Sequence, residues 1–307
     1  AATEAEALLS AGRVLEARRA LEEAEARAGP DLSARATTRR QMRREAAALG
    51  LAPGFVDVLR VPAVLHYTGH MPKPGQEDPA LEAGIAAALD AAIAAEHVGA
   101  AFGGLAAGFD IRGAEALLRA GIAPPAVRPC DPDPSEADSV APAGERWVPR
   151  YRALLSRLRI IQLDERPFPD DDLHLAMAGR RAMGLARLHA RHRDGPAVQV
   201  ASWDGQPARG AAGTGADVAS WTAAGGRSVH IPWPWPRNGG ANGQPAPRRR
   251  PMAVLFGDLP RFSALDDAGL ATFYEGPLAA MGAALDRHPA TYRNAWGDAV
   301  QITFDEV

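Results

Sequence analysis

The chain has 307 residues, of which 47% are hydrophobic, and this length predicts two domains or a little more. Its formal net charge of −3 favours neither a nucleic-acid partner nor a membrane surface. The single cysteine, Cys130, excludes an internal disulfide, and apolar runs such as residues 85–93 are shorter than the roughly 20 residues of a membrane-spanning helix. We therefore expect a cytoplasmic protein without a membrane span or a nucleic-acid partner. The missing first Met and the end after a strand-like run suggest a fragment cut at both ends.

The first fifty residues have a helical pattern. Apolar and small residues recur at helical spacing, and the corner Ser10-Ala11-Gly12 divides them into two helices over residues 5–26. The residues expected on the apolar side are Ala7, Leu8, Leu15, Ala17, Leu21 and Ala24. The run Gly-Arg-Val-Leu-Glu-Ala resembles the turn of a tetratricopeptide repeat, which implies a surface for a protein partner over residues 1–50. An isolated amphipathic hairpin is the equal alternative, because no second copy of the repeat is visible. A further basic helix is expected over residues 34–49.

From residue 61 onward, short apolar runs alternate with helical segments, which predicts an α/β domain with a Rossmann-like parallel sheet. We expect strands over residues 63–67, 98–102, 159–163, 198–203 and 228–231. We expect helices over residues 78–96, 113–120, 147–158, 173–191 and 216–224. The domain is expected to span residues 61–235, and the Gly-, Pro- and Asn-rich run over residues 236–250 predicts a linker.

Two glycine-containing corners of this sheet are candidates for a ligand site. Gly103 and Gly104 follow the second expected strand, and Gly205, Gly213 and Thr214 follow the fourth. Glycine lets backbone amides approach an anion, and the carboxyl ends of parallel strands open on a shared crevice. For the first corner, a tight turn without a ligand is the equal alternative.

Further residues near these corners extend the pattern, namely Thr68, Gly69, His70, Glu115 and Asp204. The whole set resembles the SLOG-type Rossmann-like folds, which include the DNA-processing protein A family and the cytokinin-activating nucleotide hydrolases, and less closely the nucleoside deoxyribosyltransferases. The resemblance implies a nucleotide-like ligand, with Asp204 and Glu115 contacting its ribose or base and His70 lining the crevice. A helix cap or a surface charge is the alternative for both acids. The glycine and acid signature is less full than in the hydrolases, so sensing is favoured over the alternative of a nucleotide N-glycosidase.

The last segment predicts a strand, a long helix and a hairpin, which is half of a ferredoxin-like α+β fold. The expected elements are a strand over residues 252–258, a helix over 267–287, and strands over 291–296 and 299–304. The first strand is expected beside the hairpin, so that Asp258 at its end faces Asp298 at the hairpin corner. Two such carboxylates suit a site for Mg²⁺ or Mn²⁺ ions. The alternative is that they cap a turn and a hairpin.

The runs Phe256-Gly257-Asp258-Leu259 and Trp296-Gly297-Asp298 carry a second resemblance. They are similar to the class III adenylate and guanylate cyclases over residues 252–307, which would form the first part of that catalytic domain within a domain of residues 251–307. The resemblance implies a homodimer, Asp258 and Asp298 as metal ligands, and contacts to the triphosphate from Leu259, Pro260, Arg261, Phe262 and Ser263. Arg261 replaces a usual glycine, and Asn294 replaces the usual base-recognising lysine, so the choice of base is open.

These patterns together predict a multidomain signalling protein with a nucleotide-sensing domain and a cyclase output. The cyclase would convert a nucleoside triphosphate to a cyclic nucleotide and pyrophosphate. The given chain ends before the later residues of that catalytic domain, so we expect it to be inactive by itself. A binding scaffold with a degenerate cyclase segment is the alternative.

Overall fold

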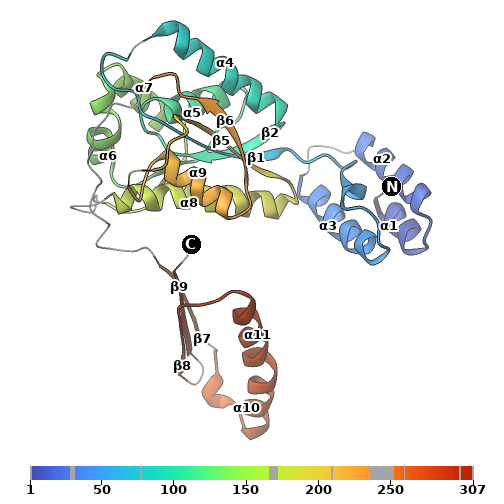
Figure 1. Cartoon of the computed structure of the whole chain (residues 1–307). Helices are drawn as coiled ribbons and strands as arrows, with labels where there is room; N and C mark the ends of the chain where they lie inside the picture. The colour runs from blue at the N-terminus through green and yellow to red at the C-terminus, as the bar shows by residue number, and fades with distance from the viewer. Residues whose placement is uncertain are drawn as a thin grey trace. The chain divides into compact units, whose positions relative to one another are not determined.

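The computed structural model describes residues 2–27, 32–76, 78–165, 172–208, 210–235, 252–258, 260–296 and 299–305. The chain forms two compact units, Ala1–Ala246 and Pro247–Val307, and each is considered by itself (Figure 1). The expected linker over residues 236–250 lies outside the described residues. Within the described ranges, no helix combines the length and the apolar character needed to cross a membrane.

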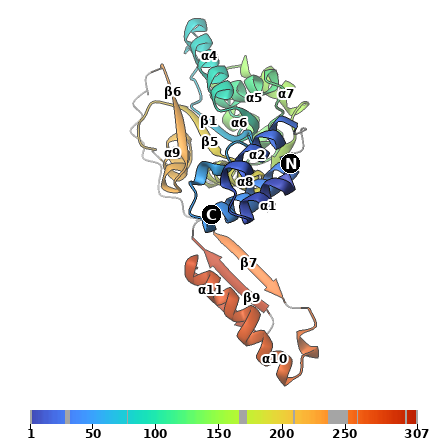
Figure 2. The same ribbon diagram turned by 90° about the vertical axis from the view of Figure 1, so that its right-hand side faces the viewer.

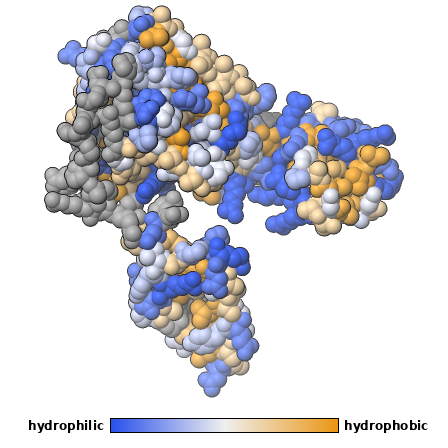
Figure 3. All heavy atoms as spheres, viewed as in Figure 1, coloured by the Kyte–Doolittle hydropathy of each residue, from blue (hydrophilic) through white to orange (hydrophobic). Residues whose placement is uncertain are grey.

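The first unit begins with a group of helices. These are α1 (Ala2–Ser10), α2 (Val14–Arg27), α3 (Leu32–Ala48) and the 3₁₀ helix η1 (Pro53–Val56). They share a core that includes Leu9, Leu21 and Met42. The expected helices are thus present, but the placement of Leu15 in the core was wrong, because this side chain is 78% exposed. The buried stripe of α2 passes through Ala17 and Leu21 instead. Figure 3 shows apolar residues gathered on the exposed surface of these helices.

A six-stranded sheet follows, and all of its paired strands are parallel. Its strands are β1 (Ala63–Gly69), β2 (Val98–Gly103), β3 (Ala126–Arg128), β4 (Ile160–Gln162), β5 (Ala197–Trp203) and β6 (Arg227–Pro232). Their order in space is β4-β3-β2-β1-β5-β6. The Rossmann-like sheet expected from the sequence is confirmed. Strand β3 was missed, because a strand of three residues is too short to show a period.

Helices cover both faces of the sheet (Figure 2). They are α4 (Pro79–Ala95), α5 (Phe109–Arg119), α6 (Pro132–Ser139), the 3₁₀ helix η2 (Ala141–Ala143), α7 (Trp147–Leu155), α8 (Leu173–Arg193) and α9 (Thr214–Ala223). Leu65 and Tyr67 of β1 pack toward α4, α5 and α7, whereas Val64 packs toward α8 and α9. This alternation follows from the period of two along a strand. Helix α6 was not predicted, because its sequence PDPSEADS has no apolar period.

The second unit contains a strand, a helical segment and a hairpin in the expected order. Its elements are β7 (Ala253–Asp258), η3 (Phe262–Ala264), α10 (Asp267–Phe273), the π-helical turn η4 (Tyr274–Leu278), α11 (Ala279–Arg287), β8 (Tyr292–Trp296) and β9 (Ala299–Phe304). The strands form an antiparallel sheet in the order β7-β9-β8. The single long helix of the prediction is divided by the π-helical turn, which contains Pro277, a residue without a backbone N–H.

Candidate functional site

The strand order changes direction between β1 and β5. From β1 the chain proceeds outward through β2, β3 and β4, and it then returns to place β5 and β6 on the other side of β1. In open α/β sheets, ligands bind in the crevice outside the carboxyl ends of the strands at such a point. A cavity of about 520 Å³ lies there, lined by residues that follow β1 and β2, by the first half of α8 and by the start of α9. Its volume is within the usual range for small-molecule sites.

Asp110, in the first turn of α5, is the most enclosed acid of this cavity. Its side chain is 9% exposed, and its Oδ2 accepts a hydrogen bond of 3.3 Å from the amide of Ala106. Its Oδ1 is buried and has no hydrogen-bond partner in the part of the chain that the structure describes. A buried acceptor without a partner is costly, unless a ligand or a water molecule supplies the donor.

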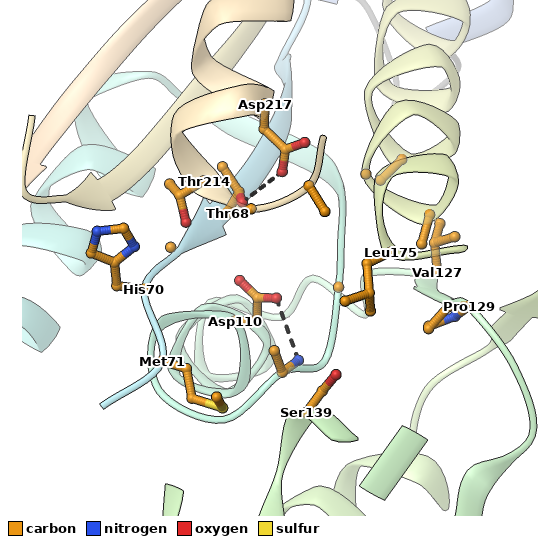
Figure 4. Close-up of a pocket in the computed structure, with 18 of the residues that line it drawn as sticks. Thr68, His70, Met71, Asp110, Val127, Pro129, Ser139, Leu175, Thr214 and Asp217 are labelled. Carbon is orange, nitrogen blue, oxygen red and sulfur yellow. Dashed lines mark hydrogen bonds between the residues drawn. The ribbon is translucent and has the colours of Figure 1, made fainter. Parts of the chain in front are cut away.

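Asp217, in the first turn of α9, is the second acid at the same end of β1 (Figure 4). It is half-buried, and its Oδ2 accepts a hydrogen bond of 2.9 Å from the hydroxyl of Thr68. Figure 4 shows the carboxyl groups of Asp110 and Asp217 on two sides of Thr68. Residues from α5, α9 and β1 thus meet at one point of the cavity.

Both acids hold protons more tightly than free aspartates do. Burial raises the pKa of Asp110 to about 7, the amides of Ala106 and Gly69 oppose the rise, and the charge of Asp217 adds to it. Burial also raises the pKa of Asp217 to about 6, against the opposing hydrogen bond from Thr68 and the charge of Arg180. Acids with such values near neutral pH are a recurrent property of ligand and catalytic sites.

Two glycines make room for these carboxyl groups. A Cβ atom added to Gly104 would lie 2.6 Å from Oδ2 of Asp110, and one added to Gly179 of α8 would lie 2.5 Å from Oδ1 of Asp217. Both contacts are closer than a carbon and an oxygen can approach without a shift. A glycine at each of these positions therefore leaves space for the aspartate carboxyl group. It can also let the backbone come close to a ligand.

The structure brings together most of the residues that the sequence suggested for this site. Those that line the cavity are Thr68, Gly69, His70, Gly104, Gly213 and Thr214. Those outside the lining are Gly103, Glu115, Asp204 and Gly205. Gly103 packs against the ring of Tyr67, and Asp204 lies 3.3 Å from Nε2 of His70 beside the cavity.

Glu115 has a different environment from the one its expected ligand contact requires. Its Oε1 accepts a hydrogen bond of 2.9 Å from Arg150 of α7, and its Oε2 forms an ion pair with the same guanidinium. Asp110 and Asp217, in contrast, were not selected from the sequence. The sequence signal that could have identified them is an acid shortly after an N-terminal glycine of a helix. Asp110 follows Gly108 at the start of α5, and Asp217 follows Gly213 at the start of α9.

The described part of the second unit includes some of the residues expected for a metal and triphosphate site. Asp258, at the exposed end of β7, pairs in register with Ala299, the residue that follows Asp298 in the sequence. Asn294 pairs with Gln301 two positions further along β9, and residues two apart in a strand share a face, so Asn294 and Asp258 lie on the same face of the sheet. Leu259, Gly297 and Asp298 are outside the described residues.

The turn after β7 contains an unusual backbone conformation. Arg261 has φ of 66°, in the left-handed region that favours glycine. The Phe262 ring packs against Phe273 of α10 at 5.4 Å between centroids, while Pro260 and Ser263 are exposed. Within the described residues, no group of three or more His, Cys, Asp or Glu side chains is arranged around a common metal position.

No family model and no curated protein matches this sequence. Among solved structures, DNA processing protein A from Streptococcus pneumoniae aligns with a TM-score of 0.29 and 14% sequence identity. The alignment covers 57% of this chain and 60% of that chain, so this chain spans less than two thirds of its length. A likeness this low supports no statement about ligand or activity.

Proposed function

We propose that the first unit binds a nucleotide-like ligand in the cavity beside β1 and β5, and that the protein serves nucleotide signalling. The observation that carries this proposal is the unpartnered, buried Oδ1 of Asp110 at the wall of a cavity of ligand size. The hydroxyl and amino groups of a nucleoside are the kind of donors that such an acceptor requires. The glycine corners at Gly104 and Gly213, and their resemblance to SLOG-type folds, support the same class of ligand.

The expected effect of such a ligand is a gain in thermal stability. A nucleoside or nucleotide at about 100 times its dissociation constant should stabilise the first unit by about 2.7 kcal/mol. Asp217→Asn should abolish most of this gain, because Asp217 lines the cavity, whereas Glu115→Gln should retain it, because Glu115 is outside the lining. Differential scanning calorimetry of the whole chain with a panel of the common nucleosides and nucleotides measures both. A panel without any stabilising member would refute the proposal.

Chromatography of the recovered ligand distinguishes a protein that only binds the nucleotide from one that cleaves its N-glycosidic bond. We expect the ligand to be recovered intact. Release of free base would favour the N-glycosidase alternative, for which Asp110 and Asp217 could act as the acid and the base.

A second proposed function concerns the second unit, which we infer to be part of a metal-dependent nucleotide cyclase. Two observations support it: Asp258 and Asn294 share one face of the sheet, and Arg261 keeps a glycine-like φ at the position where the cyclases usually have glycine. Asp258 offers the hard oxygen ligands that Mg²⁺ or Mn²⁺ prefers, and a bound ion would act there as a Lewis acid toward phosphate. Asn294 can donate and accept hydrogen bonds at the edge of a base.

Replacing the expected metal ligand should remove cyclase activity. In the full-length protein with Mg²⁺ or Mn²⁺, we expect Asp258→Ala to lower cyclic nucleotide production by at least about 100-fold, because the ion loses a charged ligand. The matched control is Asp286→Ala, which removes an exposed acid of α11 that pairs with Arg293 at 3.2 Å. Equal activity of the two variants would contradict the metal role, and an inactive parent protein would favour the scaffold alternative.

A further inference from the structure

The charges around the cavity are unusual for a site that would bind phosphate. The acids among its described lining residues are Asp110, Asp138, Asp172 and Asp217. None of the lining residues that the structure describes is a lysine or an arginine, and the cation whose charge reaches Asp217 is Arg180, which follows the lining residue Gly179 in α8. Phosphate groups are usually bound by arginine, lysine or the free N-terminus of a helix.

The helix termini at the cavity do not replace the lysine and arginine side chains that its described lining lacks. The helices α5, α8 and α9 all begin at its wall, and a helix N-terminus attracts negative charge. Each of these termini already has an acid of its own: Asp110 and Asp217 lie in the first turns of α5 and α9, and Asp172 is the N-cap residue of α8. The positive ends of the helix dipoles are therefore already compensated within the chain.

We infer that this cavity admits the uncharged, hydroxyl-bearing nucleoside part of a ligand and rejects its phosphate groups. The inference rests on the proposed binding of a nucleotide-like ligand and specifies which part of that ligand enters. A vicinal pair of sugar hydroxyls donates two hydrogen bonds, and the free Oδ1 of Asp110 is an acceptor for one of them. Asp217 has its Oδ2 occupied by Thr68 and offers its remaining acceptor capacity beside it.

Phosphate meets an unfavourable field at the same point. Like charges repel, and the effective dielectric constant of a protein site screens this repulsion less than water does, so we expect a loss of at least about tenfold in affinity. A hydroxyl group meets no such repulsion, because it offers a donor to the carboxylate. The discrimination should be largest at about pH 8, above the pKa values of about 7 and about 6 of Asp110 and Asp217, where both are ionised.

Isothermal titration calorimetry of the whole chain at about pH 8 tests this selection. The probes are adenosine, guanosine, cytidine and uridine, each with its 5′-monophosphate, its 5′-triphosphate and its 2′,3′-dideoxy analogue, in EDTA to remove bridging cations. We expect at least one nucleoside to bind and its 5′-phosphates to bind at least about tenfold more weakly. The dideoxy analogue should also lose about tenfold, because it lacks the hydroxyl donors.

Two variants assign the selection to the carboxyl group. Asp110→Asn should lower the affinity for the nucleoside by about tenfold, because the amide is a weaker acceptor than a carboxylate. It should also reduce the ratio between the affinities for the nucleoside and the monophosphate, because the amide carries no charge to repel phosphate. Asp90→Asn, an exposed acid of α4 that lies 3.0 Å from Arg119 and outside the cavity lining, should change neither affinity. A monophosphate that binds as tightly as its nucleoside would overturn the inference and leave the proposed ligand class standing. A dideoxy analogue of undiminished affinity would overturn the role of the hydroxyls. If no nucleoside or nucleotide binds, both the inference and the proposed function fail.

Discussion

Arg39→Met should lower the free energy of unfolding of the first unit by about 3–5 kcal/mol, the usual effect of removing one partner from a buried ionic network. The Arg39 side chain is 7% exposed and donates hydrogen bonds to the carbonyl oxygens of Val56, at 2.9 Å, and of Leu59. It also donates to the carbonyl oxygen and Oδ2 of Asp194, both at 3.1 Å, and to Oδ1 of Asp57. Methionine fills a similar volume but leaves the carbonyl oxygens of Val56 and Leu59 without this donor, while Asp194 keeps its ion pair with Arg43 at 2.9 Å.

The neighbouring arginine provides the control. Arg40 lies on the same helix, is exposed, and donates one hydrogen bond of 3.3 Å to the carbonyl of His192, so Arg40→Met should change stability by less than about 0.5 kcal/mol. Urea unfolding followed by circular dichroism compares the two variants with the parent chain. Equal midpoints for both variants would show that the network does not join α3 to the Rossmann-like sheet and its helices.

The alternation of strands and helices in the first unit could be read from the sequence, because its apolar runs alternate with helical patterns along the chain. The buried strand β5 and the helix α8 were expected nearly at their observed limits. The short strand β3 and the polar helix α6 could not be read, because both are stabilised by their neighbours in space rather than by a local pattern.

The position of the candidate site could also be predicted, because the carboxyl ends of parallel strands must converge. Its acids could not, since burial is a property of the fold. Glu115 was chosen instead of Asp110, and it comes five residues later in α5, a rotation of about 140° around the helix axis. That rotation directs Glu115 toward Arg150 rather than toward the cavity. Asp217 is close in the sequence to the predicted Thr214, but its hydrogen bond to Thr68, its place in the cavity lining and its raised pKa all depend on the fold.

The second unit shows a limit of another kind. The order of its elements followed from apolar periods, and the central place of β9 brings the end of β7 beside the start of β9. The π-helical turn could have been expected from Pro277, which has no N–H to donate to the preceding turn. The expected metal pair depends on Asp298, which is outside the described residues, so that prediction stays a prediction.

Asp110→Asn should stabilise the first unit at about pH 8 by about 2–4 kcal/mol and leave its stability nearly unchanged at about pH 4. In the unfolded chain Asp110 has an ordinary pKa, whereas burial raises the pKa in the folded chain to about 7. Below the unfolded value both states hold the proton, and Asp110 then costs the folded chain no stability. As the pH rises toward 7, the unfolded state loses its proton first, so the free energy of unfolding falls with pH. Asparagine is neutral throughout and avoids that loss.

Thermal or urea unfolding between about pH 4 and pH 8 measures this difference as a change in slope. The variant should keep a contribution of the same sign from Asp217, whose pKa is raised to about 6. The Asp110→Asn/Asp217→Asn double variant should lose both contributions and become more stable as the pH rises from about 4 toward about 6.5, because burial lowers the pKa of His66 to about 3 and this side chain is protonated only in the unfolded chain. Asp90→Asn, an exposed acid, should follow the parent chain at every pH. If Asp110→Asn instead destabilises the protein at high pH, then Asp110 has a stabilising partner and is not held for a ligand. If Asp110→Asn is more stable but binds the nucleoside more weakly, then Asp110 lowers the stability of the folded chain and contributes to ligand binding.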